Sequence, residues 1–388
     1  MNGKDFVTEQ HIIDWRRHIH ANPELSFQEV ETSKYIYEVL ESFGAYELER
    51  PTATSVVATL KGAKPGKTIA LRADIDALPI LEETAIDFKS KNDGVMHACG
   101  HDAHTAMLLG AAEGIAKLKD QINGTVKLFF QHAEELLPGG ARELVAAGVM
   151  EGVDYVFGIH VSPALDTGVI GYRVGFTHAA PDTFQLTIQG KGAHAARPHV
   201  SIDPILIGAE IVNALHHIVS RNIDPFDNVV LTIGEFSSGN AANVIPDTAY
   251  IQGTIRTVDA ETRKLMQARI ENIINHSLEM HNATGELVYT IGYDPVINDE
   301  TAVNFVKAAA EKVVGTAKME EITPGMGGED FSAYMTKAPG AFFNIGVGIN
   351  ESEGYGISVH HPKFKIDEAG LVNGSAMHVQ LVLDLLSE

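Results

Sequence analysis

The chain has 388 residues, 45% of them hydrophobic, which is typical of a globular protein and long enough for two domains. Its 51 acidic and 29 basic residues give a net charge of −22, which disfavours nucleic acid and anionic membrane as partners. The N-terminal segment lacks the apolar core of a signal peptide, and no run reaches the roughly 20 apolar residues of a membrane helix. One cysteine excludes an internal disulfide. We therefore expect a cytoplasmic protein.

The first part of the chain alternates helical and extended patterns. Apolar residues at helical spacing predict helices at residues 9–20, 28–43 and 103–118. Runs of β-branched and aromatic residues predict strands at residues 55–60, 68–73, 125–131 and 155–161. This alternation predicts an α/β domain with a mostly parallel mixed sheet and helices on both faces.

The middle of the chain follows a different order. Its patterns predict, in chain order, a strand around 184–188, a helix at 203–221, strands at 228–236 and 248–257, a helix at 261–282 and a strand at 286–293. The order β-α-β-β-α-β is that of a ferredoxin-like unit. A helix at 302–314 and a strand at 341–347 follow. We therefore expect a discontinuous catalytic domain of residues 1–181 and 294–388, with an inserted α+β lid domain at 182–293.

The only cysteine, Cys99, lies among three histidines, His97, His101 and His104. A lone cysteine is usually a small buried apolar side chain, but a thiol flanked by imidazoles is typical of a metal site. Alternate side chains of an extended segment share a face, so Cys99 and His101 could reach one ion.

Further candidate ligands follow the predicted strands. Glu134 and Glu135 come after the third strand, His160 closes the fourth, and the His360-His361 pair lies near the C-terminus. Each alone is compatible with a solvated loop side chain, whereas the clusters together predict a metal site. Adjacent residues of an extended segment point apart, so one carboxylate could bind metal while its neighbour takes a proton from water. Acidic residues also precede helices, and a helix is expected after them.

Seven motifs, in this order and spacing, resemble the aminoacylase and carboxypeptidase-G-type family of metallohydrolases: HACGHDAHTAMLLGAA, FQHAEE, GIHV, GKGAHAARPH, NVIPD, GGEDF and HHPKF. More narrowly they resemble its amidohydrolase branch, which includes hippurate hydrolases, plant auxin-conjugate hydrolases and bacterial N-acetyl-diaminopimelate deacetylases. The resemblance extends from about residue 10 to the end of the chain. The family's layout, a catalytic α/β domain with an inserted lid, agrees with the predicted organisation.

This resemblance implies a site that holds one or two divalent ions. The implied ligands are Cys99, His101, Glu135, His160 and His360, with His361 left open as an alternative to His360. Their N, O and S donors are compatible with Mn, Zn, Co or Ni. The resemblance also makes Glu134 the general base and acid. It makes His194 a lid histidine that stabilises the oxyanion, often across a dimer interface, and so implies a homodimer through the lid domain.

Several other residues have two interpretations. Asn240 or Asn243, together with Arg256, are candidates for holding a substrate carboxylate, which an arginine fork suits, although an arginine on the surface is commoner. Asp76 and Asp102 could orient metal-bound histidines or could serve as buried caps and salt-bridge partners.

The wider family's peptidases carry a His-x-Asp motif where this chain has Arg72-Ala73-Asp74-Ile75-Asp76. Asp74 therefore stands at the place of a ligating histidine, and Cys99 takes over a ligand role. This is the pattern of the amidohydrolase branch, so it disfavours a peptidase and leaves the number of ions open.

The expected function is metal-dependent hydrolysis of the amide of an N-acyl-L-amino acid, as in deacetylases and hippurate hydrolases, with a small-molecule substrate and a metal-activated water. A metallo-dipeptidase or carboxypeptidase of the same family is the alternative. Two further alternatives are a metal-dependent binding protein without catalysis, which the presence of Glu134 disfavours, and nucleophilic catalysis by Cys99, which would need no metal.

Overall fold

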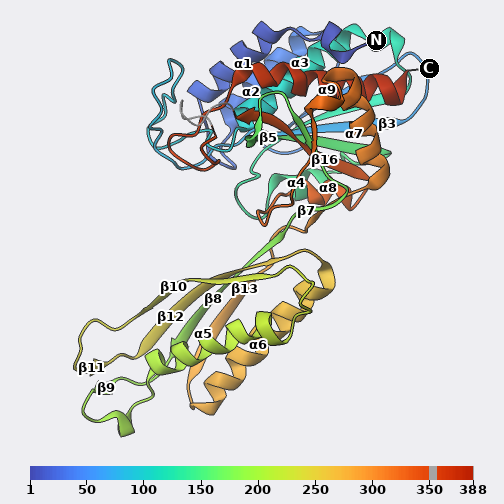
Figure 1. The fold of residues 1–388 in the computed structure, drawn as a ribbon. Helices are drawn as coiled ribbons and strands as arrows, with labels where there is room; N and C mark the ends of the chain where they lie inside the picture. The colour runs from blue at the N-terminus through green and yellow to red at the C-terminus, as the bar shows by residue number, and fades with distance from the viewer. Residues whose placement is uncertain (349–355, 388) are drawn as a thin grey trace. The chain divides into compact units, whose positions relative to one another are not determined.

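The computed structural model describes residues 1–348 and 356–387 and divides into two compact units. Unit 1 comprises Met1–Thr177, Val296–Pro324 and Asp330–Glu388, and unit 2 comprises His178–Pro295 and Gly325–Glu329. Each unit contains its own sheet and its own buried apolar core (Figure 1). The assignment of unit 2 as a lid and dimerisation domain stays a prediction.

Unit 1 contains most of the helices and strands. Its helices are α1 (Glu9–Ala21), α2 (Val30–Ser42), α3 (His101–Lys117), α4 (Gly140–Ala146), α7 (Glu300–Val313), α8 (Ser332–Met335) and α9 (Leu371–Leu386). Its strands are β1 (Glu47–Glu49), β2 (Val56–Lys61), β3 (Thr68–Asp74), β4 (Thr125–Gln131), β5 (Tyr155–Asp166), β6 (Ile170–Tyr172), β7 (Gly175–His178), β14 (Val296–Asn298), β15 (Met319–Glu321) and β16 (Gly340–Gly348).

The large sheet of unit 1 has the strand order β1-β2-β4-β3-β5-β16-β6-β15. The central strands β4, β3, β5 and β16 run parallel to one another. Antiparallel pairs join β1 to β2, β2 to β4 and β16 to β6. Asp74 pairs with Gln131 where β3 and β4 end, so these two parallel strands deliver their carboxyl ends to one edge, where ligand sites of such sheets form.

Alternate residues of the central strands face two different cores. Ile69, Leu71, Leu128 and Phe130 belong to the larger core with side chains from α1, α2, α3, α7 and α9, whereas Phe129 belongs to a smaller core with side chains from α4 and α8. Period-two alternation in a strand sends neighbours to opposite faces. The predicted mixed α/β sheet with helices on both faces is confirmed (Figure 1).

The sequence patterns did not predict helix α9. Nearly all its residues are buried, including the polar Asn373, Ser375, His378 and Gln380, so its polar residues do not mark a solvent-exposed face as they do in a surface helix. Contrary to the expectation from the sequence, the stretch Glu368–Leu386 is long and apolar enough to cross a membrane by length and composition alone. However, 78% of its apolar window is buried inside the structure, as in the core helix of a globular domain.

Unit 2 has a four-stranded antiparallel sheet of order β10-β12-β8-β13. Its elements are β8 (Ala180–Gln189), β9 (Ala193–His194), α5 (Pro204–Arg221), β10 (Val230–Ser238), β11 (Val244–Ile245), β12 (Thr248–Thr257), α6 (Ala260–Met280) and β13 (Thr284–Thr290). Helices α5 and α6 pack on one face of this sheet (Figure 1). A β-α-β-β-α-β chain with this strand order is the predicted ferredoxin-like unit.

Candidate metal centre

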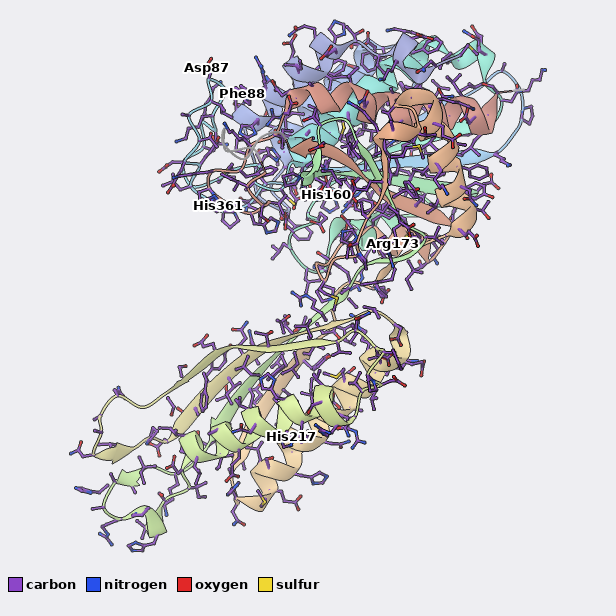
Figure 2. All side chains as sticks on the ribbon, in the orientation of Figure 1. Asp87, Phe88, His160, Arg173, His217 and His361 are labelled. Carbon is purple, nitrogen blue, oxygen red and sulfur yellow. The ribbon has the colours of Figure 1, made fainter. Side chains whose placement is uncertain are left out.

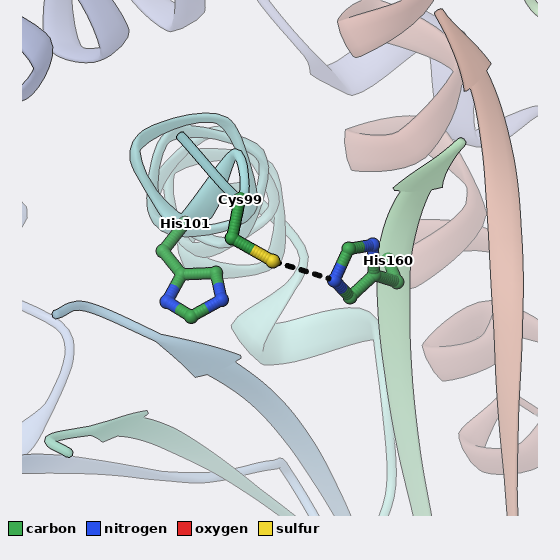
Figure 3. Close-up of side chains that lie close together, drawn as sticks. All are labelled: Cys99, His101 and His160. Atoms are coloured by element: carbon green, nitrogen blue, oxygen red, sulfur yellow. Dashed lines mark hydrogen bonds between the residues drawn. The ribbon is translucent and has the colours of Figure 1, made fainter. Parts of the chain in front are cut away.

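Cys99, His101 and His160 form the centre of a cluster of metal-ligating side chains in unit 1 (Figure 3). Cys99 lies just before α3, His101 is the first residue of α3, and His160 lies on β5. The Cys99 Sγ atom is 3.4 Å from His160 Nε2, and one ligand atom of each residue lies within 4.8 Å of the others. One thiol and two imidazoles together suit a transition-metal ion.

Two carboxylates and a third histidine adjoin these residues. One ligand atom each of Cys99, Glu135 and His360 also lies within 4.8 Å of the others, and the same holds for His101, Glu134 and Glu135. Both carboxylates approach His101 Nε2 to 3.9 Å. The structure therefore brings the five predicted ligands and the predicted general base to one place in unit 1.

Gly100 places Cys99 and His101 on the same site, though not in the way that the sequence suggested. The segment is not extended here, because Gly100 has φ +92° and ψ +17° and His101 already begins α3. A Cβ atom at Gly100 would lie 2.4 Å from Val161 Cγ2. Glycine is needed both for the left-handed backbone and for the close approach to β5.

The Glu134-Glu135 pair also departs from the extended geometry expected of it. These residues lie in a bend after β4, and the preceding Ala133 has φ +48°. Because the backbone turns there, the two carboxylates do not point apart but face the same imidazole, that of His101. The backbone N–H of Glu135 donates to Asp76 Oδ2 at 3.0 Å, which ties the bend to the end of β3.

The hydrogen bonds of His101 and His160 determine which ring nitrogen each presents. His101 Nδ1 lies 3.0 Å from the carbonyl oxygen of Asp76, and His160 Nδ1 lies 2.7 Å from that of Val161. A carbonyl only accepts, so each Nδ1 carries a proton, and Nε2 is the ring nitrogen that each histidine can offer to a metal. The Asp76 carboxylate also lies 3.1 Å from His101 Nδ1, as expected for a residue that orients a metal-binding histidine.

Two buried atoms at the centre of the cluster make no hydrogen bond with any part of the chain that the structure describes. They are His101 Nε2 and Glu135 Oε1, which lie 3.9 Å apart; of the two, Glu135 Oε1 has an ion-pair contact with His360 Nε2 at 3.1 Å. Buried polar atoms without partners are costly and rare. An imidazole nitrogen and a carboxylate oxygen at this separation fit a shared cation, so the residues present suit a divalent metal.

The electrostatics of the cluster agree with this fit. Burial opposes protonation of His101, but the nearby carboxylates of Asp74, Asp76 and Glu135 outweigh it and raise the pKa of His101 to about 10. Burial, followed by the charges of Glu135 and Glu134, raises the pKa of the Cys99 thiol well above its usual value. Buried negative charge contributes to both shifts, and a divalent cation would neutralise it.

His360, rather than His361, is the member of the C-terminal pair that reaches this cluster. His360 Nε2 lies 3.1 Å from Glu135 Oε1, and its backbone N–H donates to the carbonyl of Ala98 at 2.7 Å. His361 is exposed at the margin of unit 1 (Figure 2) and accepts the backbone N–H of Lys363 through Nδ1. A positive φ of +65° at His360 separates the directions of the two rings.

Asp102 lies outside the cluster. Its Oδ2 atom accepts from Arg16 Nε at 3.0 Å and from His20 Nδ1 at 2.8 Å, in a fully buried pairing. This arrangement corresponds to the salt-bridge interpretation of Asp102, whereas Asp76 contacts a candidate ligand directly.

Sequence reasoning missed the part played by His104 and Asp74. His104 Nδ1 donates to Asp74 Oδ1 at 2.6 Å, and its Nε2 accepts the backbone N–H of Val161 at 2.9 Å. Both of its nitrogens are therefore occupied. The spacing of three residues between His101 and His104 on one helix was a signal that both imidazoles lie on the same face.

The remaining predicted residues belong to unit 2. His194 lies on β9 and pairs with Val244 on β11, next to exposed Asn240 and Asn243. Arg256 lies near the other end of β12, eight residues beyond Thr248, a distance of about 26 Å along a strand. Within unit 2, Arg256 and the two asparagines therefore do not form one carboxylate site.

Two α/β units, one of which carries a buried Cys/His/Glu donor cluster beside a second carboxylate, define a metallohydrolase architecture. The chain matches the model of peptidase family M20/M25/M40 over residues 70–384, and it belongs to this family. The resemblance inferred from the motifs is thus confirmed.

Individual relatives support this assignment. An N-acyl-L-amino acid amidohydrolase of Geobacillus stearothermophilus is 54% identical over 287 residues, which are 74% of this chain and 78% of that protein. Thermostable carboxypeptidase 2 of Saccharolobus solfataricus is 43% identical over 379 residues, 97% of this chain and 95% of that protein. A dinuclear metal binding peptidase of family M20 from Bacillus subtilis has a crystal structure that matches with TM-score 0.82 and 37% identity, covering 97% of this chain and 98% of that one.

Proposed function

We propose that this protein is a metal-dependent amidohydrolase that cleaves the amide bond of N-acyl-L-amino acids. The observation that carries the proposal is the buried His101 Nε2, which makes no hydrogen bond among the described residues, beside the carboxylates of Glu134 and Glu135. Cys99, His101, Glu135, His160 and His360 would hold one or two divalent ions of Mn, Zn, Co or Ni. Such an ion, when bound, polarises a carbonyl and lowers the pKa of water.

Glu134 is the proposed general base and acid. Its side chain is 9% exposed, and its Oε2 atom lies 3.9 Å from His101 Nε2, so it is adjacent to the donor atoms without being needed as one of them. A carboxylate there takes a proton from the attacking water and later delivers it to the leaving amine. Its neighbour Glu135 is held by Asp76 through its backbone N–H, which keeps the two carboxylates in fixed places.

His194 is the proposed donor to the oxyanion of the tetrahedral intermediate. Its Nδ1 accepts the backbone N–H of Ala196 at 3.1 Å, so the neutral ring carries its proton on Nε2, where an exposed imidazole can donate to substrate. The resemblance to the amidohydrolase branch supports this role. It also supports Asn240, Asn243 and Arg256 as contacts of the substrate carboxylate, which Arg256 and the asparagines of one subunit would not make together.

We further infer a homodimer formed through unit 2, and a cytoplasmic location. Strand β10 is an edge of the unit 2 sheet, and Val230 and Phe236 on it are 38% and 40% exposed. An apolar edge strand of this kind favours pairing with another chain. Sedimentation of the full chain tests the dimer, and a monomer at micromolar concentration would contradict it. The single cysteine, which excludes an internal disulfide, supports a reducing compartment.

The N-acyl amino acid substrate is supported by the Geobacillus stearothermophilus relative, an N-acyl-L-amino acid amidohydrolase. A carboxypeptidase is the second candidate, because the Saccharolobus solfataricus relative is a thermostable carboxypeptidase. The two activities share the metal centre and differ in the acyl group that the site accepts.

One experiment separates the two. Metal-reconstituted protein and a Glu134→Gln variant would be assayed for amine release from N-acetyl and N-benzoyl amino acids, free dipeptides and N-blocked dipeptides. Turnover of the acyl amino acids that is lost in the variant would support the proposal. Release confined to the C-terminal residue of dipeptides would overturn the substrate assignment in favour of the carboxypeptidase.

A further inference from the structure

His104 and His160 are linked through a single residue of β5. The backbone N–H of Val161 donates to His104 Nε2 at 2.9 Å, and the carbonyl of the same residue accepts from His160 Nδ1 at 2.7 Å. The two rings also meet edge to face, with centroids 4.5 Å apart. His104, which none of the proposed steps uses, is therefore joined to a proposed metal ligand both through the backbone and through ring contact.

The hydrogen-bond geometry shows which ring nitrogens of His104 and His160 carry protons. An amide N–H can only donate, so His104 Nε2 holds a lone pair and His104 Nδ1 carries the proton that is given to Asp74 Oδ1 at 2.6 Å. A carbonyl can only accept, so His160 Nδ1 is also protonated. His160 Nε2 is left with its lone pair, 3.4 Å from Cys99 Sγ and facing the cluster.

Asp74, at the other end of this series of hydrogen bonds, is held by further buried groups. Asp74 Oδ2 accepts from Arg72 Nη1 at 2.6 Å, and Arg72 Nη2 donates to Asp330 Oδ1 at 2.9 Å. All three side chains are buried. Gln131 accepts from Arg72 Nε and donates to Asp330. Because these groups fulfil one another's hydrogen-bonding capacity, Asp74 has little freedom to move. Its hydrogen bond to His104 therefore holds the His104 ring in a fixed position.

We propose that His104 is a positioning residue that holds Val161 and thereby fixes both the orientation of His160 and the nitrogen that it offers to the metal. The inference rests on the proposed function, in that His160 is taken as a ligand. Without an acceptor at the position of His104 Nε2, the buried N–H of Val161 loses its partner, and the residue whose carbonyl directs His160 Nδ1 is held less firmly. Partners of this kind typically change metal affinity by about 10- to 100-fold.

Two substitutions each remove one of the two hydrogen bonds of His104 and keep the other. The amide of His104→Asn reaches the position of Nδ1 and can still donate to Asp74, but it cannot reach Val161. The longer His104→Gln can place its amide oxygen at the position of Nε2 and accept from Val161, while it loses Asp74. Thr105→Val is the matched control, since it removes another buried hydrogen bond of α3 to Asp74, from Thr105 Oγ1 to the backbone carbonyl.

The readouts are the affinity for Co²⁺, measured by competition with a chelator, and the electronic absorption of the Co²⁺-loaded protein. We expect His104→Asn to weaken binding by about tenfold or more and to alter the ligand-field bands. His104→Gln and Thr105→Val should stay within a few-fold of the wild type with unchanged bands. Wild-type affinity and bands in His104→Asn would overturn the proposal.

Two further measurements keep the outcome decisive. His160→Ala tests the ligand itself. If this variant binds Co²⁺ as tightly as the wild type, the proposed metal centre fails. If His160→Ala binds Co²⁺ more weakly while His104→Asn binds it as tightly as the wild type, only the positioning role of His104 is refuted. If His104→Asn does not fold, nitrogen-15 NMR of imidazole groups in the metal-free wild type decides instead. Protonation of both His104 and His160 at Nδ1 is expected, and a proton on Nε2 of either ring would overturn the proposal.

Discussion

The carboxylate of Glu29 accepts the backbone N–H of Ala133 at 2.8 Å, although the two residues are 104 positions apart in the chain. The same oxygen accepts the N–H of Phe27 at 3.0 Å, and Thr54 donates to the other oxygen at 2.8 Å. Ala133 and Phe27 both have positive φ angles, +48° and +66°, which cost non-glycine residues free energy. Glu29 therefore stabilises the turn that delivers Glu134 to the metal centre.

Replacement of Glu29 by Ala should damage both stability and catalysis. The buried N–H of Ala133 and the partly buried N–H of Phe27 lose their acceptor, at about 1–3 kcal/mol in the free energy of unfolding. A displacement of Glu134 by about 1 Å would lower kcat by about 100-fold. Glu29→Gln keeps an acceptor oxygen and should lose much less. Denaturant unfolding and kcat at saturating metal check this, and a Glu29→Ala variant with wild-type kcat would refute the positioning of Glu134 by Glu29.

Gly100→Ala should loosen the metal centre. The left-handed backbone costs an alanine about 1–3 kcal/mol, and its Cβ would lie 2.4 Å from Val161 Cγ2, so Cys99 and His101 must shift. Gly94→Ala is the matched control, because Gly94 has φ +77° with no neighbouring atom within 4 Å of the added Cβ. Both variants should lose stability in denaturant, while only Gly100→Ala should lose metal affinity. Equal metal affinity in the two would contradict this account of Gly100.

Cys99→Ser should lower the metal content of the purified protein and its activity together. The thiol lies 3.4 Å from His160 Nε2, and a serine hydroxyl is a poorer ligand for Zn²⁺ or Co²⁺ than a thiolate. Metal analysis by mass spectrometry, with activity before and after chelation, provides the measurement. Unchanged metal content in Cys99→Ser would remove Cys99 from the ligand set, and activity that survives complete chelation would favour the cysteine nucleophile instead.

His378 should contribute to acid destabilisation of the metal-free protein. Burial, aided by the nearby His104, lowers the pKa of this α9 side chain from 6.5 to about 3. Between these two values the unfolded chain binds a proton that the folded chain does not, so the free energy of unfolding falls as the pH decreases from 6.5 towards 3. The difference between the two pKa values corresponds to a loss on the order of 5 kcal/mol in the free energy of unfolding once the histidine is fully titrated.

His378→Leu removes this linkage, so its stability should depend less on pH between 6.5 and 4 than that of the wild type. His11→Gln is the control, since the His11 side chain is 51% exposed. Denaturant unfolding at several pH values gives the comparison. Parallel pH profiles for wild type and His378→Leu would show that His378 takes up its proton equally well in the folded state.

The type of fold and the residue types of the metal centre could be read from the sequence because they depend on local patterns. Helical spacing after Ala103 predicted α3, and the alternation of Phe184, Leu186 and Ile188 predicted the strand that the structure has as β8. The concentration of Cys, His and Glu in a few motifs indicated metal chemistry. The helix α9 was not predicted, because its polar residues Asn373, His378 and Gln380 are buried together with the apolar ones and mark no solvent-exposed face.

The sequence by itself thus determined the class of fold, the family and the chemical nature of the donors. Only the tertiary structure decided their geometry. The left-handed conformations of Gly100 and Ala133 turn Cys99, His101 and both glutamates onto one site, where an extended chain would have separated the carboxylates. The bonds from Val161 to His104 and from Ala133 to Glu29 span 57 and 104 residues. Contacts across such separations in the chain arise when the whole chain packs, and the spacing of hydrophobic residues within one segment does not predict them.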